Sequence, residues 1–279
     1  MSTFVLVMDF NTKNIQQQYQ GFLSTQVLWK DSILDLEQLI LPKNNTTYFM
    51  GPMILNTRLG KRVESYVSSY LKSFDTIHIK AENIQVQKGN QTIGEIDCLL
   101  EQNQQPIHLE IIYKFYVYDA SIGTSEIEHW IGPNKKDSLA QKLDKLKNKQ
   151  LPLLFKDESK SVLKELHFNI NKVQQKVLFK AQLFVPFANQ DVVFKQLNSD
   201  CVSGFYINIK ELEQFKDCKF YIPVKLDWLI EAHLKVNWLY YTNFKEVVTK
   251  ILHQKTSPLC WMKQPNGEIF KFFLVWWKP

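Results

Sequence analysis

The chain has 279 residues, of which 45% are hydrophobic and 22% are charged, an ordinary composition for a globular protein with a substantial core. No stretch contains the roughly 18 to 20 apolar residues that a membrane helix requires. The short apolar run at the N-terminus meets Asp9 without a basic segment before it or a cleavage site after it. The four cysteines are far apart and form no C-x-x-C pair, which argues against a zinc ribbon and a disulfide framework. We therefore expect a cytoplasmic protein without a signal peptide or a membrane partner.

The net charge of +6 is unevenly distributed along the chain. Residues 131–180 contain twelve Lys or Arg against five Asp or Glu, a net charge of +7, whereas residues 1–130 contain ten against fourteen, a net charge of −4. A net charge alone is weak evidence for a polyanionic partner, because many proteins with neutral ligands are equally basic. The local basic excess says more, since it directly follows a pair of acidic predicted strands.

The N-terminal part of the chain has a helical pattern. Residues 15–41 carry apolar side chains at mixed spacings of three and four, which predicts two short helices. We expect residues 1–50 to form a helical extension that covers the core. A single clear amphipathic helix then follows an Asn56–Thr57 cap, with Glu64 at the edge of its apolar stripe.

Strands dominate the next part of the chain. Residues 76–100 predict a strand, a turn at Lys88–Asn90 and a second strand, and HLEIIYKFYVY predicts a third. After a connection of roughly 15 residues, which is longer than usual, KKDSLAQKLDKLKNKQ predicts a helix and Lys160–Leu166 a shorter one. KVLFKAQLFVPF predicts a fourth, strongly apolar strand. The order is therefore helix, three strands, helix, strand.

Residues 188–279 are richer in aromatic side chains and end in a predicted hairpin whose turn is Pro265–Gly267. We expect an α+β subdomain packed on the core. Its aromatic residues could stack nucleic-acid bases, but at this density they are more typical of a hydrophobic core.

Three charged residues stand within the most apolar of the predicted strands: Asp97, Glu110 and Lys114. Successive side chains of a strand point to opposite faces, so Glu110 and Lys114 share one face of their strand. A hairpin through Gln102–Pro106 places the acidic face that carries Asp97 beside them. Two adjacent carboxylates of this kind suit a divalent cation and an attacking water.

The alternative for Asp97 and Glu110 is a solvated face of the hairpin. Apolar Leu99 and Ile112 lie on the same faces, however, and make full solvation unfavourable. Glu95 also shares the face of Asp97 and is a candidate for a spare ligand.

The order αβββαβ, with Glu64 in the first helix, Asp97 in the second strand, and Glu110 and Lys114 in the third, resembles the PD-(D/E)XK superfamily of restriction-endonuclease-like nucleases. The segments RLGKRVESY, GEIDCLL, HLEIIYKFYV and GPNKKDSLAQKL are similar to an uncharacterised bacterial family, a domain of unknown function placed in that superfamily. The resemblance implies an α/β fold with a restriction-endonuclease-like core over residues 51–187.

The resemblance further implies a phosphodiesterase site that depends on Mg²⁺ or Mn²⁺. Asp97 and Glu110 would hold the metal, Lys114 would orient or activate the water, and Glu64 would support the site. One residue usually separates the acidic residue from the lysine in that superfamily, but here three do, and Ile112 occupies the usual lysine position. The two extra residues move the lysine about 6 to 7 Å along the same strand face. The alternative for Lys114 is a structural partner of Glu110.

The basic helix after the strands is the predicted nucleic-acid contact. A lysine-rich helix face is usually only solvated, and this is the alternative for these lysines. Their position beside the acidic strands is what favours a binding role. Phosphate-backbone binding requires cations arrayed around the catalytic carboxylates. We expect this role for Lys135, Lys136, Lys142 and Lys145.

The sequence therefore predicts a metal-dependent nuclease that hydrolyses phosphodiester bonds of DNA, or less readily RNA, by in-line attack of a metal-bound water. The alternative is a catalytically inactive nucleic-acid-binding or scaffolding protein on the same fold, which the displaced lysine motivates. A third hypothesis is a structural protein that dimerises through its aromatic C-terminal region.

Overall fold

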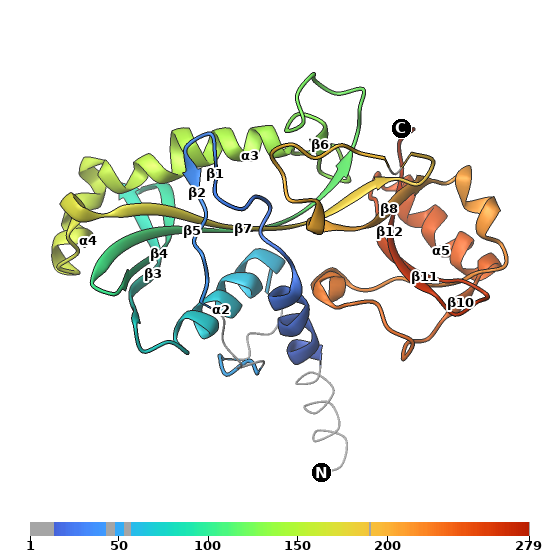
Figure 1. Cartoon of the computed structure of the whole chain (residues 1–279), viewed down its shortest axis with the longest axis horizontal. Helices are drawn as coiled ribbons and strands as arrows, with labels where there is room; N and C mark the ends of the chain where they lie inside the picture. The colour runs from blue at the N-terminus through green and yellow to red at the C-terminus, as the bar shows by residue number, and fades with distance from the viewer. Residues whose placement is uncertain (1–13, 43–47, 53–56, 190, 279) are drawn as a thin grey trace, which may run out of the picture.

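The computed structural model describes residues 14–42, 48–52, 57–189 and 191–278. Within these ranges the chain forms a mixed α/β fold with a ten-stranded mixed sheet flanked by helices (Figure 1). The helices are α2 (Leu59–Leu71), α3 (Leu139–Lys145), α4 (Lys160–Glu165) and α5 (Tyr241–His253). The strands of the sheet are β3 (Ile77–Lys88), β4 (Gln91–Gln102), β5 (Gln105–Tyr118), β6 (Trp130–Ile131), β7 (Gln174–Pro186), β8 (Val202–Asn208), β9 (Lys219–Tyr221), β10 (Leu239–Tyr240), β11 (Leu259–Lys263) and β12 (Ile269–Val275).

The central elements follow one another in the predicted order, with the short strand β6 added in the long connection. Strands β3, β4 and β5 form an antiparallel meander, and β7 returns parallel to β5. A parallel neighbour requires a crossover connection, which α3 and α4 supply on one face of the sheet, opposite α2 (Figure 1). The turn between β4 and β5 lies at Asn103 and Gln104, whose φ angles of 50° and 67° are those of a tight two-residue hairpin.

Within the described residues 14–42, the structure has one helix where the sequence predicts two. Residues 14–24 are helical, but the second predicted helix is wrong, because the strands β1 (Ser32–Ile33) and β2 (Leu36–Glu37) form a small hairpin there. Its turn residues Leu34 and Asp35 have φ angles of 50° and 64°. This left-handed conformation belongs to hairpin turns and cannot continue a right-handed helix.

Part of the described N-terminal segment, residues 14–42, lies against an edge of the sheet. Isolated bridges join Val27 to Lys180 and Gln38 to Val177, so this segment protects the part of β7 that precedes its pairing with β8. Covering an unpaired edge in this way satisfies backbone groups that would otherwise be open to another strand.

The C-terminal region continues the same sheet. Strand β8 pairs in parallel with β7, β12 in parallel with β8, and β11 and β12 form the predicted terminal hairpin. The aromatic side chains of this region are mainly core residues, as expected, with Phe220, Phe244, Trp261 and Phe272 fully buried. The proposed limits at residues 50 and 187 stay a prediction.

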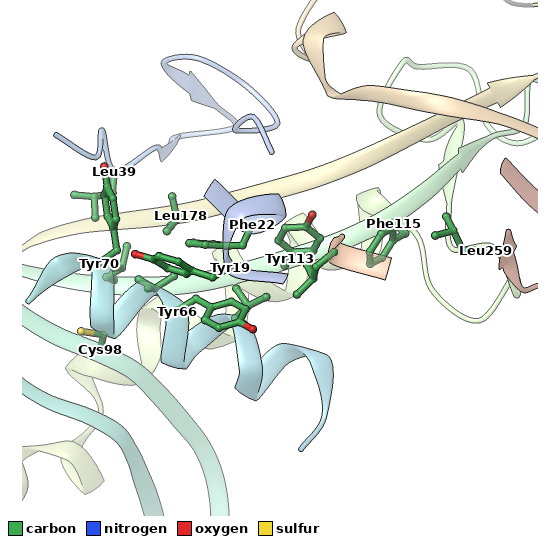
Figure 2. Packing of buried hydrophobic residues seen from close by; sticks show 14 of the residues in the cluster. Tyr19, Phe22, Leu39, Tyr66, Tyr70, Cys98, Tyr113, Phe115, Leu178 and Leu259 are labelled. Atoms are coloured by element: carbon green, nitrogen blue, oxygen red, sulfur yellow. The ribbon is translucent and has the colours of Figure 1, made fainter. Parts of the chain in front are cut away.

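Apolar side chains bury both faces of β5. On one face Tyr113 packs with Phe22 of the N-terminal helix, which in turn contacts Tyr66 of α2 (Figure 2). On the other face Ile112 joins a cluster with Leu139 of α3. By strand alternation, Glu110 therefore lies on the α3 side of the sheet. Within the described part of the chain, no helix is both long enough and apolar enough to cross a membrane.

Candidate active site

Strands β4 and β5 separate at the predicted carboxylates. Their paired register ends at Cys98 and Leu109, directly before Asp97 and Glu110. Within the described residues, β5 finds its next partner on this edge only where Val117 pairs with β6. Asp97 and Glu110 therefore lie where β4 and β5 begin to separate. We call this position the acidic fork.

The carboxylates of the acidic fork interact electrostatically. Burial raises the pKa of Asp97 to about 7, the Glu110 carboxylate adds to the rise, and Lys142 opposes it. Burial also raises the pKa of Glu64, and the Lys61 ammonium, 2.8 Å away, opposes that rise. The charges of Glu64, Asp97 and Glu110 thus act on one another, so the three predicted acidic residues lie near each other in the structure. Confined like charges of this kind are relieved by a bound cation.

The Glu110 carboxylate is completely buried and receives hydrogen bonds on both of its oxygens. On one side, the Gln150 side-chain amide donates to Oε2, while its own carbonyl oxygen accepts a 2.8 Å bond from Lys142 Nζ. On the other side, His108 Nε2 lies 3.1 Å from Oε1. Lys142, Gln150, Glu110 and His108 therefore form one continuous network.

The proton position on His108 follows from its second neighbour. Gln175 Nε2 lies 2.9 Å from His108 Nδ1 and also donates a 2.7 Å hydrogen bond to the carbonyl oxygen of Leu151. A carbonyl oxygen only accepts, so this atom of Gln175 is the amide nitrogen and donates to Nδ1. His108 then carries its proton on Nε2 and donates it to Glu110, which fixes the orientation of the carboxylate.

Lys142 is the lysine that this network holds beside the carboxylates. Burial lowers the pKa of Lys142 to about 8, and the charges of Glu110 and Asp97 act against that change. The charge of Lys114 also lowers the pKa of Lys142, but the Lys114 ammonium donates its hydrogen bond to Asp137 Oδ2. The predicted role of Lys114 in orienting water is not tested by this geometry.

A π-helical turn, η1 (Leu146–Gln150), brings Lys142 and Gln150 together. In a regular α-helix, residues eight apart point roughly 80° away from each other, because each residue turns the chain roughly 100°. A π-turn contains roughly one extra residue per turn, so it offsets most of this rotation of about 80° and lets the two side chains point to the same side. Sequence reasoning misses Gln150, since nothing in the residue pattern reveals this turn, and it misses Gln175, which reaches His108 through the pairing of β7 with β5. The available signal was His108, two residues before Glu110 on the same strand face.

Glu64 and Glu95 meet at a shared lysine. Lys61 Nζ donates to Glu64 Oε2 at 2.8 Å, to Asn83 Oδ1 at 2.7 Å, and to Glu95 Oε1. Glu64 also borders a cavity of about 610 Å³ beside α2. The structure thus places Glu64 between this cavity and the acidic fork, and it pairs Glu95, the candidate spare ligand, with Lys61.

The four predicted nucleic-acid-binding lysines have different surroundings. Lys135 forms a 3.2 Å ion pair with Asp119 and lies 3.9 Å from the centre of a tryptophan ring. Lys136 is exposed at the rim of a cleft, Lys142 is half-buried at the acidic fork, and Lys145 is exposed at the end of α3. Their roles therefore differ, although each of them stays a prediction.

The donor set of the acidic fork agrees with the chemistry of Mg²⁺ or Mn²⁺. Both cations prefer carboxylate oxygen, and Mg²⁺ retains several waters, so that one or two protein carboxylates are enough to anchor it. Among the described residues, no group of three or more His, Cys, Asp or Glu side chains is arranged to hold a metal ion. Asp97 and Glu110 are the two carboxylates of the acidic fork that could hold such a cation.

Comparison with known proteins gives a family but no activity. The model of the family DUF1853, described as a domain of unknown function, matches residues 16–274 of the chain. No curated protein and no solved structure matches the chain.

Proposed function

The chain therefore belongs to the DUF1853 family, and we propose that it is a cytoplasmic, metal-dependent nuclease on a restriction-endonuclease-like core. Its substrate is DNA or, less readily, RNA. The observation that carries the proposal is the acidic fork, where Asp97 of β4 and Glu110 of β5 lie at the point where the two strands separate. Lys142 of α3 interacts electrostatically with both carboxylates. The order of the surrounding elements supports the restriction-endonuclease-like core.

Asp97 and Glu110 are the residues that would hold Mg²⁺ or Mn²⁺. A cation bound there would activate a water molecule and neutralise charge on the phosphate. The protein fixes both carboxylates: Asp97 through the backbone N–H of Ile111, and Glu110 through His108 and Gln150. Such orienting hydrogen bonds strengthen a metal site, because the ligands lose little freedom when the cation binds.

Lys142 supplies the positive charge of the proposed site. Hydrolysis forms a bond from the water oxygen to phosphorus while the bond to the leaving oxygen breaks, and negative charge grows on the phosphate oxygens. An ammonium held by Gln150 beside the carboxylates is placed to stabilise that charge. Lys142 would thereby take the part that the sequence pattern assigns to Lys114.

The proposal is tested with fluorescently labelled single-stranded and double-stranded DNA in Mg²⁺, Mn²⁺ or EDTA. We expect cleavage with either metal, none in EDTA, and none by Asp97→Asn or Glu110→Gln. Asp217→Asn, which removes an exposed carboxylate elsewhere, serves as the control and should cleave normally. If no cleavage occurs in any metal and calorimetry detects no Mg²⁺ or Mn²⁺ binding that depends on Asp97, the proposal is refuted.

A non-catalytic nucleic-acid-binding or scaffolding protein on the same fold is the second candidate. The ion pair of Lys114 with Asp137 favours it, because it engages the lysine that the nuclease pattern requires. This candidate predicts DNA binding that is unchanged by metal ions and by Asp97→Asn.

A further inference from the structure

A cleft of about 730 Å³ lies along β5 and begins at Tyr113, three residues beyond Glu110 of the acidic fork. It is lined by the beginning of α2, by residues 113–115 on the unpaired edge of β5, by the loop before α3, and by residues 225–228 of the C-terminal region. We call it the basic cleft. The proposed nuclease chemistry leaves this space unused, although Lys114 reaches it from a position only four residues beyond Glu110.

The lining of the basic cleft is strongly cationic. Arg58, Lys114, Lys136 and Lys225 line it, against the single acidic side chain of Asp137. Asp137 is already paired with Lys114. Arg58, Lys136 and Lys225 are exposed, and within the described residues they form no salt bridge. A concave surface that concentrates unpaired cations attracts polyanions and raises their local concentration.

Aromatic surface accompanies these cations. Trp228 is half-buried and packs edge-on against Phe115, with ring centres 5.3 Å apart, while Lys225 Nζ lies 5.2 Å from the centre of the indole ring. Tyr113 and Phe115 also line the cleft but are buried in the core, so Trp228 is the partly exposed aromatic ring of this lining. Flat aromatic rings stack on nucleic-acid bases, and neighbouring cations contact the phosphates between them.

The C-terminal region holds one wall of the basic cleft in place. Trp277 Nε1 donates a 2.9 Å hydrogen bond to the carbonyl oxygen of Pro133, and Ser257 Oγ donates to the same oxygen at 2.7 Å. The backbone N–H of Ser257 donates to Asn134 Oδ1 at 2.7 Å. Because both Pro133 and Asn134 line the cleft, its shape exists before any ligand binds, which lowers the cost of binding.

We infer that the basic cleft binds a single unpaired strand of nucleic acid and directs its phosphodiester backbone into the acidic fork. This inference rests on the proposed nuclease function and adds the strandedness of its substrate. A duplex covers the faces of its bases and offers mainly phosphates and groove edges. A lining that places the partly exposed ring of Trp228 among cations instead matches a strand whose bases are free to stack.

The test measures fluorescence anisotropy of a labelled oligo(dT) strand and of a labelled hairpin duplex of equal length, in EDTA to prevent cleavage. We expect the single strand to bind more tightly than the duplex. Arg58→Ala and Lys225→Ala should each raise the Kd for oligo(dT) about fivefold and reduce the slope of log Kd against log salt concentration by about 0.7. Lys250→Ala, which removes an exposed cation of α5 that pairs with Glu246, is the control and should bind like the wild type.

Equal or tighter binding of the duplex overturns the inference, as does an equal loss of affinity in Lys250→Ala. Binding is measured in EDTA and cleavage is measured with Mg²⁺, so the two assays separate this result from the proposed function. If the wild type binds as expected but never cleaves with Mg²⁺, the nuclease proposal fails and the cleft remains a strand-binding site. If the wild type cleaves but both cleft variants bind like it, the cleft inference alone fails.

Discussion

The Asp97 carboxylate accepts a 2.9 Å hydrogen bond from the backbone N–H of Ile111 on the neighbouring strand. The bond lies just beyond the last paired residues of β4 and β5, so a side chain replaces backbone pairing at the fork. It satisfies one backbone donor that the separation of the strands would leave open. An asparagine could accept the same bond through its side-chain carbonyl, which allows the charge of Asp97 to be tested apart from its geometry.

Asp97→Asn should make the metal-free protein more stable at pH 8. Burial and the nearby Glu110 raise the pKa of Asp97 to about 7, so the ionised carboxylate is unfavourable in the folded state. We expect the free energy of unfolding to rise by about 1 to 3 kcal/mol. Urea denaturation in EDTA measures this change, with Asp217→Asn as a neutral control. A loss of stability in Asp97→Asn would show that the carboxylate is a structural group.

Lys142→Met should reduce DNA cleavage far more than Lys114→Met does. Lys142 belongs to the hydrogen-bond network of Glu110, whereas Lys114 pairs with Asp137. We expect kcat to fall about 100-fold or more in Lys142→Met and KM to carry most of the effect in Lys114→Met. Steady-state kinetics separate the two, and Lys145→Met controls for charge on the same helix. A larger loss of kcat in Lys114→Met would instead support the lysine that the sequence pattern indicates.

The carboxylates of the fork were accessible to sequence reasoning because strands have a period of two. Asp97 and Glu110 each follow from side-chain alternation, and the tight turn at Asn103 and Gln104 sets the register that brings their faces together. The same alternation placed Leu99 and Ile112 on these faces. Local rules of this kind need no knowledge of distant contacts.

The partners of Glu110 depend on distant contacts, and the sequence does not reveal them. Gln175 reaches His108 because β7 pairs with β5 in parallel, which joins residues 67 positions apart in the chain. Gln150 depends on a π-turn that has no residue signature. The N-terminal hairpin was missed for a related reason, since Leu34 adopts a left-handed conformation that is unusual for leucine.

Gln150→Leu tests whether the network of Glu110 contributes to stability and activity together. The substitution removes a donor to the buried Glu110 carboxylate and the acceptor of Lys142. An unsatisfied buried charge is costly, so we expect the free energy of unfolding to fall by about 1 to 3 kcal/mol and cleavage to fall with it. Gln141→Leu, at an exposed position of α3, is the matched control. If both variants unfold at the same urea concentration, Gln150 does not support Glu110.

Lys180→Met should become more destabilising as pH rises. Lys180 Nζ donates to the carbonyl oxygens of Phe22, Leu23 and Thr25, where the N-terminal helix ends, at 3.0, 3.1 and 2.6 Å. Burial lowers the pKa of Lys180 from 10.5 to about 8. Between these two values the unfolded chain holds a proton that the folded chain has released, so the wild type gains stability relative to the variant as pH rises.

The difference in free energy of unfolding between wild type and Lys180→Met should therefore increase from pH 7 to pH 10, by about 3 kcal/mol at most. Urea denaturation at several pH values measures this difference. Comparing the wild type with the variant cancels the titration of all other groups. Lys30→Met, at an exposed position, should show no such trend. A difference that stays constant with pH would mean that Lys180 keeps an ordinary pKa, because its hydrogen bonds to the helix end offset the cost of burying its charge. A difference that shrinks with pH would mean that these bonds raise the pKa above its ordinary value.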